Sequence, residues 1–216
     1  VTNCPEDLGK HRGVRCGAIG DAKLVLRQMI DEVKRQVGAT GRPENTGLKR
    51  EIATAKQAFL AEWAPRLQSE EIPINPYRVI TELAKAVDVA NTMLTHDSGF
   101  PRDQFVPFWE PVSPRGYLGW GKSTQLGYGL GLALGAKMAV PEKQVINVMG
   151  DASFGMAGMD VETAARAEIP ITTVVLNNGV MTKYSTYIPV ASEVWGSNKL
   201  TGDYRMMGEA LGAYSQ

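Results

Sequence analysis

The sequence predicts an α/β fold with a doubly wound parallel sheet, in which helices cover both faces to give three layers. Short apolar or β-branched runs at 90–95, 145–149 and 171–176 have the length of buried strands. Helical patterns alternate with these runs, and right-handed crossovers bring the ends of successive strands to one edge. Glycine, at 23 of 216 residues, makes up about 11% of the chain against a usual ~7%. Part of this excess lies on one predicted helix that we expect to pack closely against the sheet: Gly127, Gly129, Gly131 and Gly135.

Residues 1–19 show no periodicity, and the first predicted element is an amphipathic helix. Asp21 serves as its N-cap and Gly38 ends it. A segment rich in glycine, proline and asparagine follows at 39–45 and is the candidate domain boundary. The apolar positions of the helix recur at helical spacing: Leu24, Leu26, Met29, Ile30, Val33 and Val37.

Two further helices are expected before the first strand. Thr46 caps a charged helix that runs to about Trp63, with Pro65 beyond it. Asn75 and Pro76 then begin a helix as its N-cap and first helical residue. After the first strand, the predicted elements are an irregular stretch up to 121, helices at 124–138, 157–167 and 204–211, and a polar loop before the last helix.

Charge and hydropathy argue against two classes of partner. The 23 Lys and Arg residues balance 23 Asp and Glu, whereas proteins that bind nucleic acid carry a basic excess. No apolar run reaches the roughly 18 residues that cross a bilayer. Cys4 and Cys16 flank His11 without a close fourth ligand. We therefore expect two reduced thiols of a cytoplasmic protein rather than a zinc site.

One motif matches a phosphate-binding pattern, but its context argues against that function. Residues 116–123, GYLGWGKS, fit G-x-x-x-x-G-K-[ST], with Lys122 on the phosphates and Ser123 on Mg²⁺. A P-loop follows a buried strand, but Pro111 and Pro114 precede this segment. The motif also carries two bulky aromatic residues where the backbone should wrap around phosphate. A nucleotide hydrolase is therefore the disfavoured alternative.

Polar side chains follow two neighbouring strands of the predicted sheet. Asp151 comes directly after the strand at 145–149, and Asn178, 27 positions later, follows the strand at 171–176. Open α/β sheets bind ligands at this edge. A helix cap or a turn would explain either residue alone, but the pair at this spacing favours a ligand site.

The residue types at this edge indicate which ligand would bind there. Carboxylate and carboxamide oxygens suit Mg²⁺ or Ca²⁺ rather than zinc. Ala152 and Ser153 precede a helix, so their amides favour an anion. The sequence therefore predicts a diphosphate bridged by a metal ion.

These residues resemble the cofactor signature of thiamine-diphosphate-dependent enzymes, in which GD-x is followed by a helix, a strand and NN. Here the signature reads GDASFGMAGMDVETAARAEIPITTVVLNNG at 150–179. THDSGFPRD at 95–103, Pro114-Arg115 and LGYGLGLALGAK at 126–137 resemble acetolactate synthase, oxalyl-CoA decarboxylase and 2-hydroxyacyl-CoA lyase. The resemblance extends from Pro73 to the end, and its motifs are specific for the cofactor rather than for the substrate.

The resemblance implies thiamine diphosphate and Mg²⁺ as cofactors. Carried over residue by residue, it makes Asp151, the side chain of Asn178 and the carbonyl of Val180 the protein ligands of the metal. The residues implied to hold the diphosphate are Gly99, Phe100, Gly150, Ala152 and Ser153.

The resemblance also implies contacts to the cofactor rings and to the substrate. Leu126 falls where the family places a bulky apolar residue between the two rings. The carbonyl of Thr124 would accept a hydrogen bond from the exocyclic amine, although the family has glycine there. Met181 and Tyr184 would face the substrate, and core packing explains Met181 equally well.

The resemblance divides the chain into three parts. Residues 1–40 would be the C-terminal remnant of a middle domain, 41–72 a linker and helix, and 73–216 the thiamine diphosphate and Mg²⁺ domain, cut short at its end. In the family the activating glutamate lies on a separate pyrimidine-binding domain, supplied by the neighbouring subunit of a homodimer or homotetramer. Nothing before residue 73 resembles that domain, so the catalytic residue is not expected on this chain.

The implied activity is that of a decarboxylase and carboligase acting on 2-oxo acids, similar to acetolactate synthase. The alternatives within the family act on acyl-CoA substrates, as 2-hydroxyacyl-CoA lyase or oxalyl-CoA decarboxylase. We expect the chain alone to bind the cofactor and to catalyse nothing. A non-catalytic cofactor-binding module is the further alternative.

Overall fold

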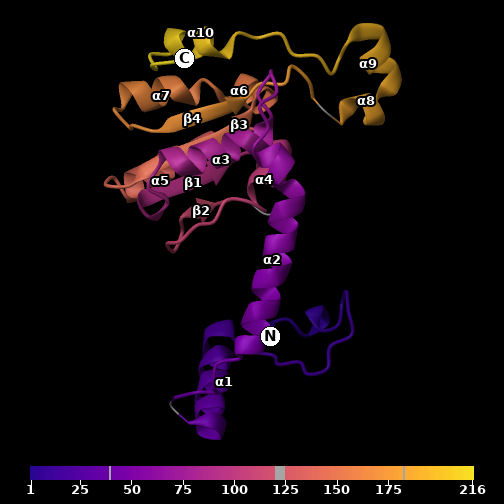
Figure 1. Ribbon diagram of the computed structural model, residues 1–216, viewed down its shortest axis with the longest axis vertical. Helices are drawn as coiled ribbons and strands as arrows, with labels where there is room; N and C mark the ends of the chain where they lie inside the picture. The colour runs from indigo at the N-terminus through magenta and orange to yellow at the C-terminus, as the bar shows by residue number, and fades with distance from the viewer. Residues whose placement is uncertain (39, 120–124, 182) are drawn as a thin grey trace. The chain divides into compact units, whose positions relative to one another are not determined.

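A computed structural model describes residues 1–38, 40–119, 125–181 and 183–216. The chain divides into two compact units, 1–60 and 61–216. The first unit contains the short 3₁₀-helix η1 (Pro5–Asp7) and the helix α1 (Ala22–Val37). The second contains the sheet and the candidate site (Figure 1).

The predicted amphipathic helix is present with both of its predicted ends. The Asp21 carboxylate accepts a hydrogen bond from the Leu24 amide at 3.0 Å, and Gly38 ends the helix with a φ of 77°. No described residue of α1 is buried, and its apolar side chains, among them Leu24 and Val33, are exposed. The apolar stripe therefore forms a helix face without a core beneath it.

The helix α2 (Thr46–Leu67) begins and ends differently from the prediction. The side chain of Asn45 accepts from the Leu48 amide at 2.9 Å, so the capping residue precedes Thr46. The helix also continues through Pro65. Proline in the last turn removes only one backbone hydrogen bond. The Trp63 ring, on the preceding turn, packs 4.9 Å from that of Tyr77.

The described residues form a parallel four-stranded sheet in the order β2-β1-β3-β4. β1 (Thr92–His96), β3 (Gln144–Gly150) and β4 (Thr172–Leu176) confirm the three predicted strands. β2 (Tyr117–Leu118) was not predicted, because two residues are too short to show a pattern. β1 pairs with β3 in register from Thr92–Gln144 to His96–Val148.

Helices cover both faces of the sheet, which confirms the predicted three layers (Figure 1). α3 (Pro76–Ala86) and α4 (Phe100–Phe105) pack on one face. α5 (Tyr128–Ala139), α6 (Asp151–Ala157), α7 (Asp160–Arg166) and α10 (Tyr204–Ala210) lie on the other. Alternation along β3 supplies both cores, with Ile146 and Val148 facing the first layer and Val145 and Met149 the second.

Several boundaries differ from the predicted ones, for local reasons. α3 begins at Pro76 as predicted, with the Asn75 side chain accepting from the Tyr77 amide at 3.0 Å. α5 begins only at Tyr128, since Gly127 adopts a φ of 95°. The predicted helix at 157–167 corresponds to α7, which begins at Asp160, and α6 before it was not predicted. The 3₁₀-helix η2 (Val89–Asn91) overlaps the start of the predicted first strand. The predicted irregular and polar stretches contain the further short helices α4, α8 (Tyr184–Tyr187) and α9 (Pro189–Trp195).

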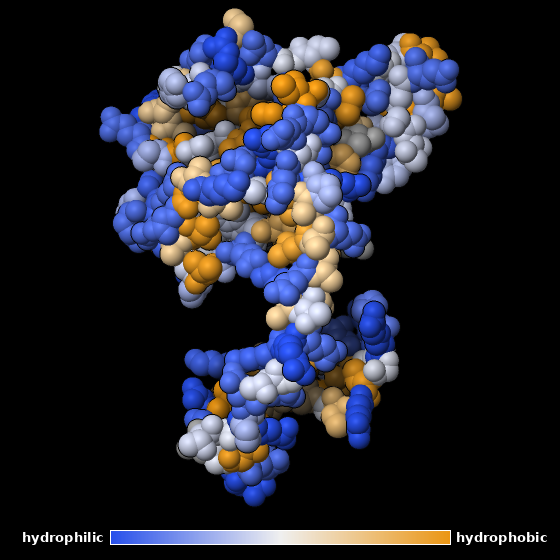
Figure 2. Space-filling model, viewed as in Figure 1, coloured by the Kyte–Doolittle hydropathy of each residue, from blue (hydrophilic) through white to orange (hydrophobic). Residues whose placement is uncertain are grey.

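The surface carries apolar side chains on α8 and α9, where Tyr187, Val190 and Trp195 are exposed. The outer end of this segment is orange, and therefore apolar, at the upper right of Figure 2. Among the described residues, no helix combines the length and the hydropathy that crossing a bilayer requires.

Candidate functional site

The structure brings Asp151 and Asn178 together at the carboxyl ends of β3 and β4. Gly150 pairs with Leu176 across the two strands, so the residues that follow them meet. One oxygen of the Asp151 carboxylate, Oδ2, accepts from the Asn178 amide at 3.2 Å and from the Gly179 amide at 2.7 Å. Asp151 is 3% exposed. This buried carboxylate therefore ties the end of one strand to the loop that follows the other.

Short contacts hold the loop after β4 in place. The Asn178 side-chain oxygen accepts from the Val180 amide at 3.1 Å. Val180 forms an isolated antiparallel bridge with Lys199, and the Met181 amide donates to the Asn198 carbonyl at 2.7 Å. Tyr184 begins α8 and is 42% exposed. Val180 and Met181 are thus held close to the Asp151 edge, while Tyr184 reaches solvent.

The residues expected to hold the diphosphate lie where β3 meets α6 and where α4 begins, and Ala152 and Ser153 are within α6 rather than before it. The Ala152 amide donates to Asp151 Oδ1 at 2.8 Å. The Ser153 hydroxyl donates to Asp97 Oδ1 at 2.7 Å and is buried, so its direction is already determined by a protein partner. Gly99 precedes α4 with a φ of 79°, and the side chain of Phe100 is exposed.

Leu126 is half-buried and immediately precedes Gly127, at the start of α5. Thr124, Lys122 and Ser123 lie outside the described residues. The described part of the P-loop-like motif includes residues 117–118, which form the strand β2 beside β1.

Sequence reasoning missed Asp97, which is fully buried directly after β1. It follows its strand as Asp151 follows β3, so the strand-end argument extended to the first strand would have found it. The hydrogen bonds of its carboxylate reach both α5 and α6.

His96, the last residue of β1, is a second buried polar group that was not predicted. It is 2% exposed, and its ring stacks on that of Tyr117 at 5.2 Å. Nδ1 lies 3.0 Å from the Asp97 carbonyl and 3.2 Å from the Tyr128 hydroxyl. Burial lowers the pKa of His96 and raises that of Tyr117.

Acidification is expected to destabilise the fold through His96. Its folded-state pKa lies below the ordinary 6.5 because burial disfavours the imidazolium. The unfolded chain therefore binds a proton that the fold excludes, and stability falls as the pH drops below 6.5 toward the folded pKa. The neighbouring charges are Arg102, Asp97 and Asp103. Urea unfolding at about pH 7.5 and about pH 5.5 measures the difference.

His11 provides the control for this prediction, because it is the only other histidine of the chain and is exposed. His96→Gln should reduce the loss of stability between the two pH values, whereas His11→Gln should leave it unchanged. An equal pH dependence in the two variants would show that His96 does not cause it.

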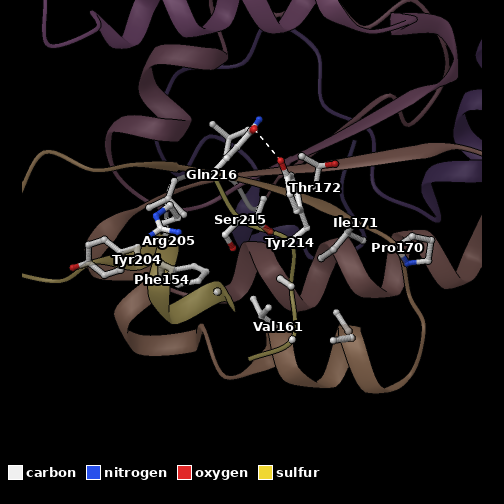
Figure 3. Close-up of a pocket in the computed structure, with 18 of the residues that line it drawn as sticks. Phe154, Val161, Pro170, Ile171, Thr172, Tyr204, Arg205, Tyr214, Ser215 and Gln216 are labelled. Atoms are coloured by element: carbon white, nitrogen blue, oxygen red, sulfur yellow. Dashed lines mark hydrogen bonds between the residues drawn. The ribbon is translucent and has the colours of Figure 1, made fainter. Parts of the chain in front are cut away.

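Two cavities lie beside the sheet. One of about 1100 Å³ runs beside β4, where Phe154, Thr172 and Tyr204 surround it (Figure 3). None of the described residues predicted for the site lines this cavity. A second, of about 640 Å³, is lined by His96, Arg102, Asp103, Val106, Pro107, Tyr117 and Gly119.

The oxygen atoms available at the Asp151 edge are suitable ligands for a hard divalent cation. They are carboxylate, carboxamide and backbone oxygens, the ligand types that Mg²⁺ prefers. Within the described part of the chain, no group of three or more His, Cys, Asp and Glu side chains could hold a metal ion. A metal at this edge would therefore need other oxygens besides carboxylates, from carboxamide or backbone groups, water or a bound ligand, and Mg²⁺ commonly takes some of them from phosphates.

The fold and this edge together define an α/β domain in which Asp151 and Asn178 meet at the carboxyl ends of neighbouring strands. The family described as "Thiamine pyrophosphate enzyme, C-terminal TPP binding domain" matches residues 97–214. The chain belongs to this family of thiamine-diphosphate-dependent enzymes.

Curated relatives include proteins named acetolactate synthase and 2-hydroxyacyl-CoA lyase. A probable acetolactate synthase large subunit of Methanococcus aeolicus is 27% identical over 183 residues, covering 81% of this chain and 30% of that protein. An acetolactate synthase large subunit of Mycobacterium tuberculosis is 30% identical over 169 residues, covering 78% of this chain and 29% of that protein. A 2-hydroxyacyl-CoA lyase of Saccharomyces cerevisiae is 28% identical over 177 residues, covering 81% and 31%. The matched region thus spans about 30% of the length of these relatives.

Proposed function

We propose that this chain is the diphosphate- and Mg²⁺-binding part of an enzyme similar to acetolactate synthase. The enzyme would decarboxylate a 2-oxo acid and join the resulting fragment to a second carbonyl compound. The observation that carries the proposal is the buried Asp151 carboxylate, bonded to the Asn178 and Gly179 amides where β3 and β4 end side by side. Relatives named acetolactate synthase at 27–30% identity support it.

Within this proposal, Asp151, the Asn178 side chain and the Val180 carbonyl hold Mg²⁺. Ala152 and Ser153, with the turn at Gly99, orient the diphosphate. When bound, thiamine diphosphate supplies a nucleophilic carbon and accepts the electron pair that decarboxylation releases. The polypeptide supplies binding, orientation and a partly dry environment, since Asp151 and Ser153 are buried.

Four further residues complete the proposed site. Leu126 separates the two rings of the cofactor, from its half-buried place before α5. Met181 and Tyr184 face the substrate, on the loop and helix that follow Asn178. The Thr124 carbonyl would accept a hydrogen bond from the exocyclic amine of the cofactor.

The domain organisation and the partners belong to the same proposal. Residues 73–216 form the cofactor domain, 41–72 a linker and helix, and 1–40 the end of a middle domain. The exposed apolar face of α1 supports the last assignment, because such a face is normally covered by further protein. The pyrimidine-binding domain, with the activating glutamate, would come from a neighbouring subunit of a cytoplasmic homodimer or homotetramer.

A second candidate keeps this site and changes the substrate. The yeast relative named 2-hydroxyacyl-CoA lyase is 28% identical. An acyl-CoA substrate, as for that lyase or for oxalyl-CoA decarboxylase, therefore remains the alternative.

Titration calorimetry of the 216-residue chain tests the proposed function. We expect thiamine diphosphate to bind in the presence of Mg²⁺ and to lose its binding when EDTA removes the metal, because the diphosphate needs the bridging ion. We expect no turnover of pyruvate or of a 2-hydroxyacyl-CoA by this chain alone, because the activating glutamate is elsewhere.

The matched control is Lys122→Ala, which should bind thiamine diphosphate as the unaltered chain does. Loss of binding in this variant, with ATP hydrolysis by the unaltered chain, would favour the nucleotide hydrolase. Turnover by the unaltered chain alone would contradict the proposed need for another domain.

A further inference from the structure

The carboxylate of Asp97 accepts hydrogen bonds from three segments of the chain. Asp97 is 0% exposed. Oδ1 accepts from the Ser98 amide at 2.7 Å and from the Ser153 hydroxyl at 2.7 Å. Oδ2 accepts from the Gly129 amide at 3.0 Å, and the Gly127 amide lies within 3.1 Å of both oxygens. Four donors thus converge on one buried carboxylate.

Three of the four donors lie within two residues of a position proposed to contact the cofactor or its metal. Ser98 precedes Gly99 at the diphosphate turn, and Gly127 follows Leu126. Ser153 lies two residues after the proposed metal ligand Asp151. Asp97 therefore accepts hydrogen bonds from all three segments of the proposed site: the one that would hold the metal, the one at the diphosphate and the one at the cofactor rings.

Close packing allows α5 to approach this carboxylate. A Cβ atom on Gly129 would lie 2.9 Å from the His96 carbonyl and 3.0 Å from Asp97 Oδ2. Gly127 has a φ of +95°, and a Cβ there would lie 2.7 Å from that of Ala157, at the end of α6. The amides reach Asp97 because glycine occupies both positions.

We infer that Asp97 is a positioning residue, which holds Leu126, just before α5, at a set distance from Asp151, the first residue of α6. This inference rests on the proposed function, because it assigns the two segments to the two ends of one cofactor. A carboxylate is required because every donor around it is an N–H or O–H group, and an apolar side chain would leave them buried without an acceptor.

Hydrogen–deuterium exchange of the chain without cofactor tests whether Asp97 holds the two segments together. Asp97→Asn keeps the size of the side chain but turns an NH₂ group toward donors. We expect faster exchange in peptides covering both 125–131 and 150–157, by about tenfold or more if local opening becomes easier by about 1.4 kcal/mol. Asp31→Asn, at an exposed position on α1, is the matched control and should change neither peptide. Unchanged exchange at 150–157 in Asp97→Asn would overturn the inference.

Binding of thiamine diphosphate with Mg²⁺ is the second readout, measured well below the unfolding temperature of each variant. We expect Asp97→Asn to weaken binding by about 10- to 100-fold, as loss of an outer hydrogen-bond partner does at metal sites. Inorganic pyrophosphate should lose less affinity, because it engages only one end of the site. An equal loss for both ligands, or affinity within about twofold of the unaltered chain, would refute a positioning role.

Ser153→Ala keeps the test decisive if Asp97→Asn does not fold, since it removes one of the four donors. It should raise exchange at 150–157 and leave 125–131 unchanged. The double variant should bind no more weakly than Asp97→Asn, because the two side chains act through one hydrogen bond. If the unaltered chain fails to bind thiamine diphosphate, the proposed function is refuted, while the exchange results still decide whether Asp97 ties the two segments.

Discussion

Asp151→Ala is expected to weaken the Mg²⁺-dependent binding of thiamine diphosphate by about 100-fold or more. The substitution removes the charged ligand proposed for the metal. It also removes the acceptor for the Asn178 and Gly179 amides, at 3.2 and 2.7 Å, so the loop after β4 loses its attachment. Titration calorimetry with and without Mg²⁺ measures the effect. Asp151→Asn, which keeps the size of the side chain, should show most of the loss if the charge is the main cause.

Two adjacent asparagines provide the control. Asn178→Ala should weaken binding by about tenfold or more, since its carboxamide is the second proposed ligand. Asn177→Ala should leave binding within about twofold, because Asn177 lines the cavity beside β4 instead. Equal losses in the two asparagine variants would contradict the proposed metal site.

Gly129→Ala is expected to lower the free energy of unfolding by about 3 kcal/mol. The added Cβ would lie 2.7 Å from Asn147 Oδ1 and 2.9 Å from the His96 carbonyl. The carbonyl belongs to the backbone at the end of strand β1, so relief would require α5 to move away and to strain the hydrogen bond between the Gly129 amide and Asp97. Urea unfolding followed by far-ultraviolet circular dichroism measures the change.

Gly135→Ala is the matched control on the same helix. A Cβ at Gly135 meets nothing within 4 Å, and alanine in a helix interior is favoured over glycine by about 0.5–1 kcal/mol. The two substitutions on α5 should therefore change stability in opposite directions. Destabilisation by both would show that the helix as a whole, rather than the contact at Gly129, limits substitution.

These glycines also show how far the sequence could predict the fold. The helix that carries them packs against the sheet as expected, through Leu130, Ala133 and Ala136. A Cβ atom would meet close neighbours at Gly127 and Gly129, but at Gly131 and Gly135 it would meet no atom within 4 Å. Composition shows that small residues gather on a helix, but the side of the helix that faces the sheet depends on where the helix begins. Here the positive φ of Gly127 delays that start.

The candidate site also has one part that could be predicted from the sequence and one part that could not. Asp151 and Asn178 could be paired from the sequence because each follows a strand directly, and parallel strands end at one edge. Asp97 follows its strand in the same way, but its hydrogen bonds to α5 and α6 could not be predicted, because those donors come from residues 30 to 56 positions away. Only the packing of α5 and α6 against the sheet brings those donors to one carboxylate.

The sequence by itself determined the features that depend on local pattern: the three longer strands, the caps of α1 and α3, and the cofactor signature at 150–179. The tertiary structure decided the features that depend on distant contacts. The continuation of α2 through Pro65, the two-residue strand β2 and the hydrogen bonds to Asp97 belong to this group. The physical reason is range, since periodicity and capping act over a few residues, whereas buried hydrogen bonds and close packing join segments that only the folded chain brings together.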